Sequence, residues 1–138
     1  MEAHELMQTK VLSLGSSSSL MDAAALMHDN NIRHLPIVER NEVVGIISER
    51  DLRGCLDEVY RSQAETPAGV RSKGLSIGSV MQAKPLCVDP SADIVDVIDV
   101  MLENKVGAVV VSDTLGQLRG IISYEDVLRG ARDQLSAT

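Results

Sequence analysis

The chain of 138 residues contains no Phe or Trp and only two Tyr. Proteins that hold single-stranded nucleic acid stack its bases on aromatic side chains, so this composition argues against such a platform. Cations are also in the minority, with 13 Lys and Arg against 20 Asp and Glu and a formal net charge of −7. Because a phosphate backbone is held by clustered Lys and Arg, we expect no nucleic-acid partner.

Cysteines and long apolar runs are scarce as well. Cys55 and Cys87 form no CxxC pair, which favours two reduced thiols over a metal or redox site. No apolar run reaches the roughly 18 residues that a membrane helix needs, and the start "MEAHELMQTK" lacks the order of a signal peptide, basic and then apolar. The sequence therefore predicts a folded cytoplasmic protein with no metal site and no membrane partner.

The chain contains a tandem repeat of about fifty residues. Segments 7–38 and 81–112 align without a gap at an offset of 74 residues. One inserted residue then brings 45–51, "GIISERD", opposite 120–126, "GIISYED". We therefore interpret the chain as two copies of one structural unit.

Apolar periodicity predicts the same elements in both copies. Segments 19–30 and 93–104 have the spacing of one helical face, and each opens on an N-cap residue, Ser19 or Asp93, followed three residues later by Asp. The predicted order is β-α-β-β-α, which makes the protein α+β. Strands are expected at 11–14, 34–38, 43–48, 86–88, 108–112 and 118–123, and second helices over 48–60 and 123–135.

The predicted organisation has three parts. The first repeat covers 1–60, a polar connector loop covers 61–74, and the second repeat covers 75–138. A short lead-in helix is expected before each repeat, at 2–7 and 75–81. One repeat leaves a face of its sheet open, so we expect the two repeats to cover each other.

The spacing Ser-x-x-Asp begins the second helix of both repeats. Ser48 with Asp51, and Ser123 with Asp126, fit a helix capping box. Both copies have Asp where Glu or Gln is usual, and both preserve a Gly-Ile-Ile run that a cap does not require. A hydroxyl at a helix N-terminus also suits a phosphate, and an aspartate one turn later can accept from a ribose diol. The residues leave both interpretations open.

The double unit, the segments "IRHLPIV" and "VGAVVV", and the two S-x-x-D spacings resemble a tandem pair of cystathionine β-synthase (CBS) domains, a Bateman module. The resemblance covers about Glu5 to Arg132. It implies two repeats packed through their sheets as a pseudo-two-fold pair, two clefts between them, and a disk-shaped homodimer. It also implies an adenosyl effector, namely AMP, ADP, ATP or S-adenosylmethionine.

The same resemblance implies the ligand-binding residues. In the family the motif Ser contacts phosphate and the motif Asp contacts the ribose hydroxyls, while the backbone near the first strand meets the base. The implied residues are Ser48, Asp51, Ser123 and Asp126 for the ribose phosphate, and Thr9, Lys10, Val11, Ala83, Lys84 and Pro85 for the base.

The two copies differ in one basic pair. Arg33 and His34 precede "LPIV", where several nucleotide-binding members of the family carry basic residues, whereas the second copy has Gly107 and Ala108 there. We therefore expect one cleft to be more cationic. The alternatives are a structural imidazole for His34 and a solvated charge for Arg33.

Three functions follow from these patterns. The first is a regulatory protein that binds an adenosyl ligand and signals to an unidentified partner protein by a conformational change. The second is a dimerisation or interaction module without a ligand, in which the S-x-x-D spacings are only caps. A small enzyme is the third, but the chain has no P-loop, HExxH or nucleophile elbow. We expect no catalytic residues and no required cofactor.

Overall fold

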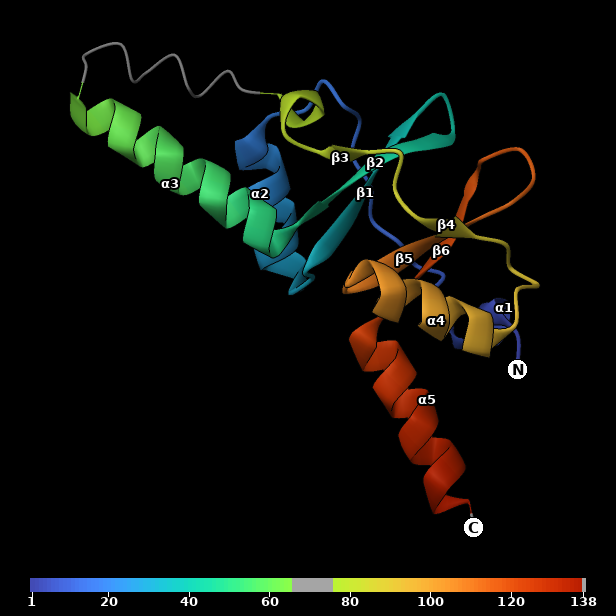
Figure 1. Cartoon of the computed structure of the whole chain (residues 1–138). Coiled ribbons are helices and arrows are strands. Elements are labelled where there is room, and N and C mark those ends of the chain that lie inside the picture. Colours follow the sequence, from blue (N-terminus) through green and yellow to red (C-terminus); the bar gives the residue numbers. More distant parts are fainter. Residues whose placement is uncertain (66–75, 138) are drawn as a thin grey trace. The chain divides into compact units, whose positions relative to one another are not determined.

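The computed structural model describes residues 1–65 and 76–137, and the side chains of 1–57 and 76–137 (Figure 1). The chain forms two compact units. The Asp126 unit, which we name after its motif aspartate, consists of Met1–Val11, Asn41–Val43 and Pro85–Thr138. The Asp51 unit consists of Leu12–Arg40 and Val44–Lys84.

The Asp51 unit is built on a three-stranded sheet of order β1-β2-β3. Strands β2 and β3 are antiparallel, with Gly45 opposite Ala83, and Leu14 adds a parallel bridge to Ile37. Helices α2 and α3 pack against each other (Figure 1). The elements are α2 (Leu20–Asn30), β1 (His34–Glu39), β2 (Glu42–Ser48), α3 (Glu49–Glu65), the 3₁₀ helix η2 (Ile77–Ser79) and β3 (Gln82–Ala83). The buried core is Leu20, Ala23, Met27, Leu35, Ile37, Ile47, Leu52 and Ile77.

The Asp126 unit repeats this arrangement. Its sheet has the order β4-β5-β6, with β4 parallel and β6 antiparallel to β5, and Gln8 adds an antiparallel bridge to Ile121. The elements are α1 (Ala3–Leu6), β4 (Cys87–Val88), α4 (Ile94–Asn104), β5 (Ala108–Ser112), β6 (Leu118–Ser123) and α5 (Tyr124–Ser136). The buried core is Ala3, Val97, Met101, Val109, Val111 and Ile122.

These elements confirm the predicted α+β class. The β-α-β-β-α order is complete in the second repeat, whereas the strand predicted at 11–14 in the first repeat is reduced to the single bridge between Leu14 and Ile37. The predicted caps are also present: the Ser19 hydroxyl accepts from the Asp22 N–H at 3.0 Å, and the Asp93 carboxylate accepts from the Val95 N–H at 2.8 Å. At the other end, Asn31 closes α2 in the left-handed conformation (φ 52°). Helix boundaries therefore follow local capping chemistry.

One further detail, the end of α3, differs from the prediction. Helix α3 continues to Glu65, so 61–65 are helical and not part of a loop, because the first Pro after Ser48 is Pro67 and no earlier residue breaks the helix. The remainder of the predicted connector, 66–74, lies outside the described residues. Among the helices described, none is both long and apolar enough to cross a bilayer.

The lead-in segments are exchanged between the repeats. In α1, the Ala3 N–H donates to the Ala92 carbonyl at 2.8 Å, so the first lead-in packs on the second repeat. In η2, the Ile77 N–H donates to the Ser18 carbonyl at 2.8 Å, so the second lead-in packs on the first repeat. The lead-in expected before each repeat therefore belongs in space to the other one. The division into repeats at 1–60 and 75–138 stays a prediction about the sequence, and the compact units cut across it.

Candidate functional site

Each S-x-x-D motif stands where a sheet strand ends and a helix begins. Ser48 ends β2 before α3, and Ser123 ends β6 before α5. In both copies the serine hydroxyl accepts from the backbone N–H of the aspartate, at 3.1 Å for Asp51 and 3.4 Å for Asp126. Both serines therefore cap their helices. Among the described residues, the reciprocal contact of a full capping box, from the serine N–H to the aspartate carboxylate, is present in the Asp126 copy and absent in the Asp51 copy.

The Asp126 carboxylate is fully engaged inside its unit. One oxygen, Oδ2, accepts from the Ser123 N–H at 2.9 Å and from the Ser123 hydroxyl at 3.0 Å. The other, Oδ1, accepts from the Gln8 amide Nε2 at 2.8 Å and from Arg129 Nη1 at 3.3 Å. Asp126 is only 4% exposed, and is the one buried charged residue among those described.

Asp51 occupies the same place in its motif, but its exposure and its hydrogen bonds differ from those of Asp126. Its side chain is exposed, and no described residue donates a hydrogen bond to its carboxylate. The contrast is visible at two aligned positions. Gln82, the counterpart of Gln8, makes no such bond, and Gly54 stands where the second copy has Arg129. One motif aspartate is thus enclosed and the other is open.

Two basic residues lie next to the open motif. The Arg33 carbonyl accepts from the Glu49 N–H at 2.7 Å, which ties the start of β1 to the start of α3. The pKa of His34 is lowered from 6.5, mainly by burial and further by the charge of Arg33, while the charge of Asp51 acts in the opposite direction. The predicted group of Ser48, Asp51, Arg33 and His34 therefore comes together within one unit.

The predicted base-contacting segments run beside the strands that end in the motifs. Gln8 bridges Ile121, and Gln82 pairs with Ile46, in each case two residues before the motif serine. Thr9, Lys10 and Val11 thus share a unit with Ser123 and Asp126, whereas Ala83 and Lys84 share one with Ser48 and Asp51; Pro85 falls in the Asp126 unit. Of these six, Val11 and Pro85 are partly buried and the other four are exposed.

The glycine of each Gly-Ile-Ile run is required by the exchanged lead-in. A Cβ atom on Gly120 would stand 2.8 Å from the Gln8 carbonyl oxygen and would also meet the Met7 sulfur. At Gly45, a Cβ would stand 3.1 Å from the Gln82 carbonyl oxygen and against the Met81 sulfur. The repeated glycine therefore serves packing, because the lead-in crosses too close for a side chain.

Sequence reasoning missed Gln8 and Arg129 as partners of Asp126. The available signal was weak: Gln occurs at both 8 and 82, and Arg129 stands three residues after Asp126, a spacing that brings side chains together on a helix. Neither pattern says which aspartate the glutamine meets. That information lies in the exchange of the lead-ins.

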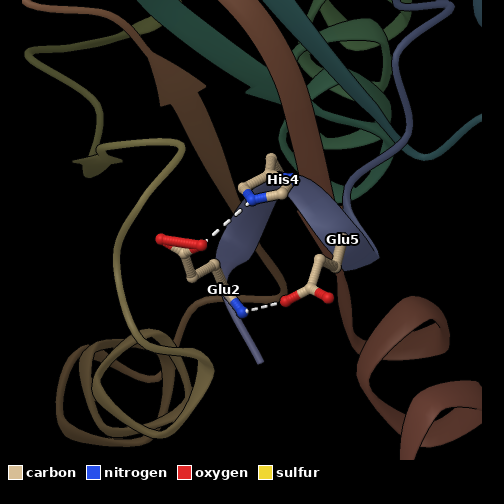
Figure 2. Close-up of side chains that lie close together, drawn as sticks. All are labelled: Glu2, His4 and Glu5. Atoms are coloured by element: carbon tan, nitrogen blue, oxygen red, sulfur yellow. Dashed lines mark hydrogen bonds and ion pairs between the residues drawn. The ribbon is translucent and has the colours of Figure 1, made fainter.

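A second polar cluster lies at the start of α1 (Figure 2). Among the described residues, Glu2, His4 and Glu5 are the one trio of His, Cys, Asp or Glu whose ligand atoms lie within 4.8 Å of each other. Glu5 accepts from the Glu2 N–H at 2.6 Å, and His4 Nε2 lies 3.1 Å from a Glu2 oxygen. All three are exposed. The contacts close the first turn of the short helix, and we assign no further role to them.

The chain contains two α+β units, and in each unit a strand ends at the serine of an S-x-x-D motif, so the protein is a tandem repeat with two related motifs. The family model described as the CBS domain matches residues 3–58 and 77–133. The chain therefore belongs to the CBS domain family, as a tandem pair.

Known proteins similar to this chain support the same assignment. A CBS domain-containing protein of Dictyostelium discoideum is 25% identical over 125 residues, which is 90% of this chain and 86% of that protein. The chain spans only 41% of a similar uncharacterised protein of Thermofilum pendens and 21% of the inosine-5'-monophosphate dehydrogenase of Thermoplasma acidophilum.

Solved structures share the fold over nearly the whole chain. The structure of CBSX2 in complex with AMP has a TM-score of 0.80 and 25% identity, with 96% of each chain covered. The CBS domain pair of the protein MJ0100, in complex with 5'-methylthioadenosine and S-adenosylmethionine, has a TM-score of 0.82 and 23% identity, with 97% of this chain and 98% of that chain covered. Both likenesses place this chain among CBS-pair folds.

Proposed function

We propose that the chain is a regulatory CBS pair that binds an adenosyl ligand and signals to a partner protein through a conformational change. The observation that carries the proposal is the open Asp51 carboxylate beside the Ser48 hydroxyl and the basic residues Arg33 and His34. The AMP complex of CBSX2, a relative with the same fold, supports an adenosyl ligand.

Each group in the open site has a chemical role in this proposal. The Ser48 hydroxyl donates to a phosphate, with the positive end of the α3 helix dipole beside it. Arg33 supplies a permanent cation. Asp51 accepts hydrogen bonds from the two ribose hydroxyls, and the backbone at Ala83 and Lys84 lies along the adenine.

Calorimetric titration with AMP, ADP, ATP and S-adenosylmethionine tests the proposal. Asp51→Asn keeps the shape of the side chain but removes the charged acceptor. Because a hydrogen bond to a charged group contributes about 1.5–3 kcal/mol, we expect affinity to fall about 10- to 150-fold. Asp57→Asn, which changes another exposed aspartate of α3, is the control. Absence of heat with all four compounds would contradict a ligand-binding role.

The second candidate is a dimerisation or interaction module without a ligand. The observation that favours it is the capping geometry of Ser48 and Ser123, which accounts for both serines without a nucleotide. In that case Asp51→Asn removes no hydrogen bond among the described residues, because the bond between the Asp51 N–H and the Ser48 hydroxyl uses the backbone. A screen in which no adenosyl compound raises the thermal midpoint would favour this candidate.

A homodimer is proposed on the exposed apolar face of the Asp126 unit. Leu128 and Leu135 lie seven residues apart on one face of α5 and are 68% and 77% exposed, and Val95 and Leu102 repeat this spacing on α4. Exposed apolar groups at such spacing are typical of a helix that packs on another subunit. Leu128→Lys should shift sedimentation toward the monomer. Leu115→Lys is the control, because Leu115 is 69% exposed but lies between β5 and β6.

The regulatory, non-catalytic role and the cytoplasmic location belong to the same proposal. A module of this kind acts when its ligand binds one conformation more tightly than another, so that a partner senses the change in population. Hydrolysis of ATP above the background rate would contradict a purely regulatory role.

A further inference from the structure

The two motif aspartates offer very different access to a ligand. Asp126 is 4% exposed, whereas Asp51 is an exposed residue. A ribose diol must reach the carboxylate oxygens to donate to them. The structure of each unit therefore decides whether its S-x-x-D spacing is available for ligand binding, although the spacing itself is identical.

We propose that Gln8 and Arg129 lock Asp126 into a structural role, so that an adenosyl ligand occupies only the motif that contains Asp51. This inference rests on the proposed function and names the residues that set its stoichiometry. The lock joins three parts of the chain: Gln8, which directly follows the first lead-in, Ser123 at the end of β6, and Arg129 in the second turn of α5.

The acceptor capacity of Asp126 is used up in this lock. An ionised carboxylate has about four lone-pair sites, and four donor groups occupy them: the Ser123 N–H and hydroxyl, the Gln8 amide and the Arg129 guanidinium. Hydrogen bonds to a charged acceptor are the strong ones, and burial strengthens them further. Two ribose hydroxyls would have to displace the Gln8 amide and the Arg129 guanidinium together.

Of the two residues that hold Asp126, the arginine is present in only one repeat. Arg129 aligns with Gly54, so the Asp51 motif has no guanidinium at this position on its helix. The basic residue next to the Asp51 motif is Arg33, which is exposed and directly precedes β1. The positive charge thus neutralises the aspartate in one copy and remains free for a phosphate in the other.

Carboxylate labelling tests the lock without any ligand. A water-soluble carbodiimide with glycine ethyl ester modifies accessible carboxylates, and mass spectrometry locates the product. We expect Asp51 and the exposed control Asp99 to be labelled in the native chain and Asp126 to be protected. In the double variant Gln8→Ala/Arg129→Gly, Asp126 should be labelled at a rate within about threefold of Asp99, an estimate for side chains of similar exposure. Labelling of Asp126 as fast as Asp51 in the native chain overturns the lock.

Calorimetry with AMP tests the consequence for ligand binding. We expect one AMP per chain, a loss of at least tenfold in affinity for Asp51→Asn, and a change below twofold for Asp126→Asn. The double variant should bind a second AMP, whereas Arg132→Gly, which removes an exposed arginine of the same helix, should bind one. Two AMP per native chain, or a tenfold loss for a folded Asp126→Asn variant, overturns the proposal.

The tests separate this inference from the proposed function. If no adenosyl compound produces heat with the native chain, the proposed function fails and the single-site assignment fails with it, but the labelling still decides whether Asp126 is locked. If the double variant loses its thermal transition, the single variant Asp126→Asn decides the outcome. Retained AMP binding supports the proposal, and loss of binding by a folded variant overturns it.

Discussion

Gly120 and Gln8 approach each other so closely that a Cβ atom on Gly120 would stand 2.8 Å from the Gln8 carbonyl oxygen. Gln8 also pairs with Ile121, the residue after Gly120: the Gln8 N–H donates to the Ile121 carbonyl at 2.9 Å, and the Ile121 N–H donates to the Gln8 carbonyl at 3.1 Å. This close crossing fixes the first lead-in on the sheet of the second repeat, and with it the position of the Gln8 amide at Asp126.

Gly120→Ala should destabilise the protein by about 1–3 kcal/mol, because the added methyl overpacks the crossing and must displace backbone as well as the Met7 side chain. Gly54→Ala is the matched control. Gly54 lies within α3 with no atom within 4 Å of the site of its Cβ, so the change should stabilise by up to about 1 kcal/mol. Urea unfolding of both variants measures the difference. Equal stabilities of the two variants would contradict the close crossing.

Stability should fall as the pH is lowered from about 7.5 to about 5.5, with His34 as one cause. Burial and the charge of Arg33 lower the folded-state pKa of His34 below 6.5. As the pH falls through 6.5, His34 therefore binds a proton in the unfolded chain before it does so in the folded protein. The free energy of unfolding decreases as a result.

Urea unfolding across this pH range checks the contribution of His34. In His34→Gln the loss of stability toward low pH should be smaller than in the native chain, since Gln does not titrate. His28→Gln, which replaces an exposed histidine, is the control variant. A His34→Gln variant that follows the native curve would show that another group causes the loss.

Ser19→Ala should cost about 1 kcal/mol, because the Ser19 hydroxyl accepts from the Asp22 N–H at 3.0 Å and the Asp22 carboxylate accepts in return from the Ser19 N–H at 3.1 Å. Ser17→Ala provides the control, as Ser17 is exposed and precedes the helix. Chemical unfolding of both variants measures the effect. A Ser19→Ala variant as stable as the control would mean that the box contributes nothing to the start of α2.

The elements of the fold could be predicted because their signals are local. Ser19 and Asp93 cap their helices where the sequence placed the caps, and the apolar runs at 34–38 and 108–112 became β1 and β5. The repeat and its motifs also predicted the CBS family, which the family match confirms. Local patterns report backbone period and helix ends, and these properties hold before any long-range contact forms.

The roles of the two motifs could not be read in the same way. Asp51 and Asp126 stand in nearly identical sequences, and only the fold encloses one of them with Gln8 and Arg129. The ligand-binding assignments remain predictions, including those for the backbone at Thr9, Lys10 and Pro85. The accessibility of Asp126 depends on Gln8, which is 118 residues away in the sequence. The local spacing of the motif therefore does not indicate whether the aspartate is open.

The sequence by itself thus determined the repeat, the order of strands and helices, their caps and the family. Tertiary structure alone decided that each lead-in pairs with the other repeat, that Gly45 and Gly120 must lack side chains, and that one aspartate is closed while the other is open. The physical reason is that a strand's apolar pattern specifies that it will pair, but the free sheet edge that it fills is selected by the packing of the whole unit.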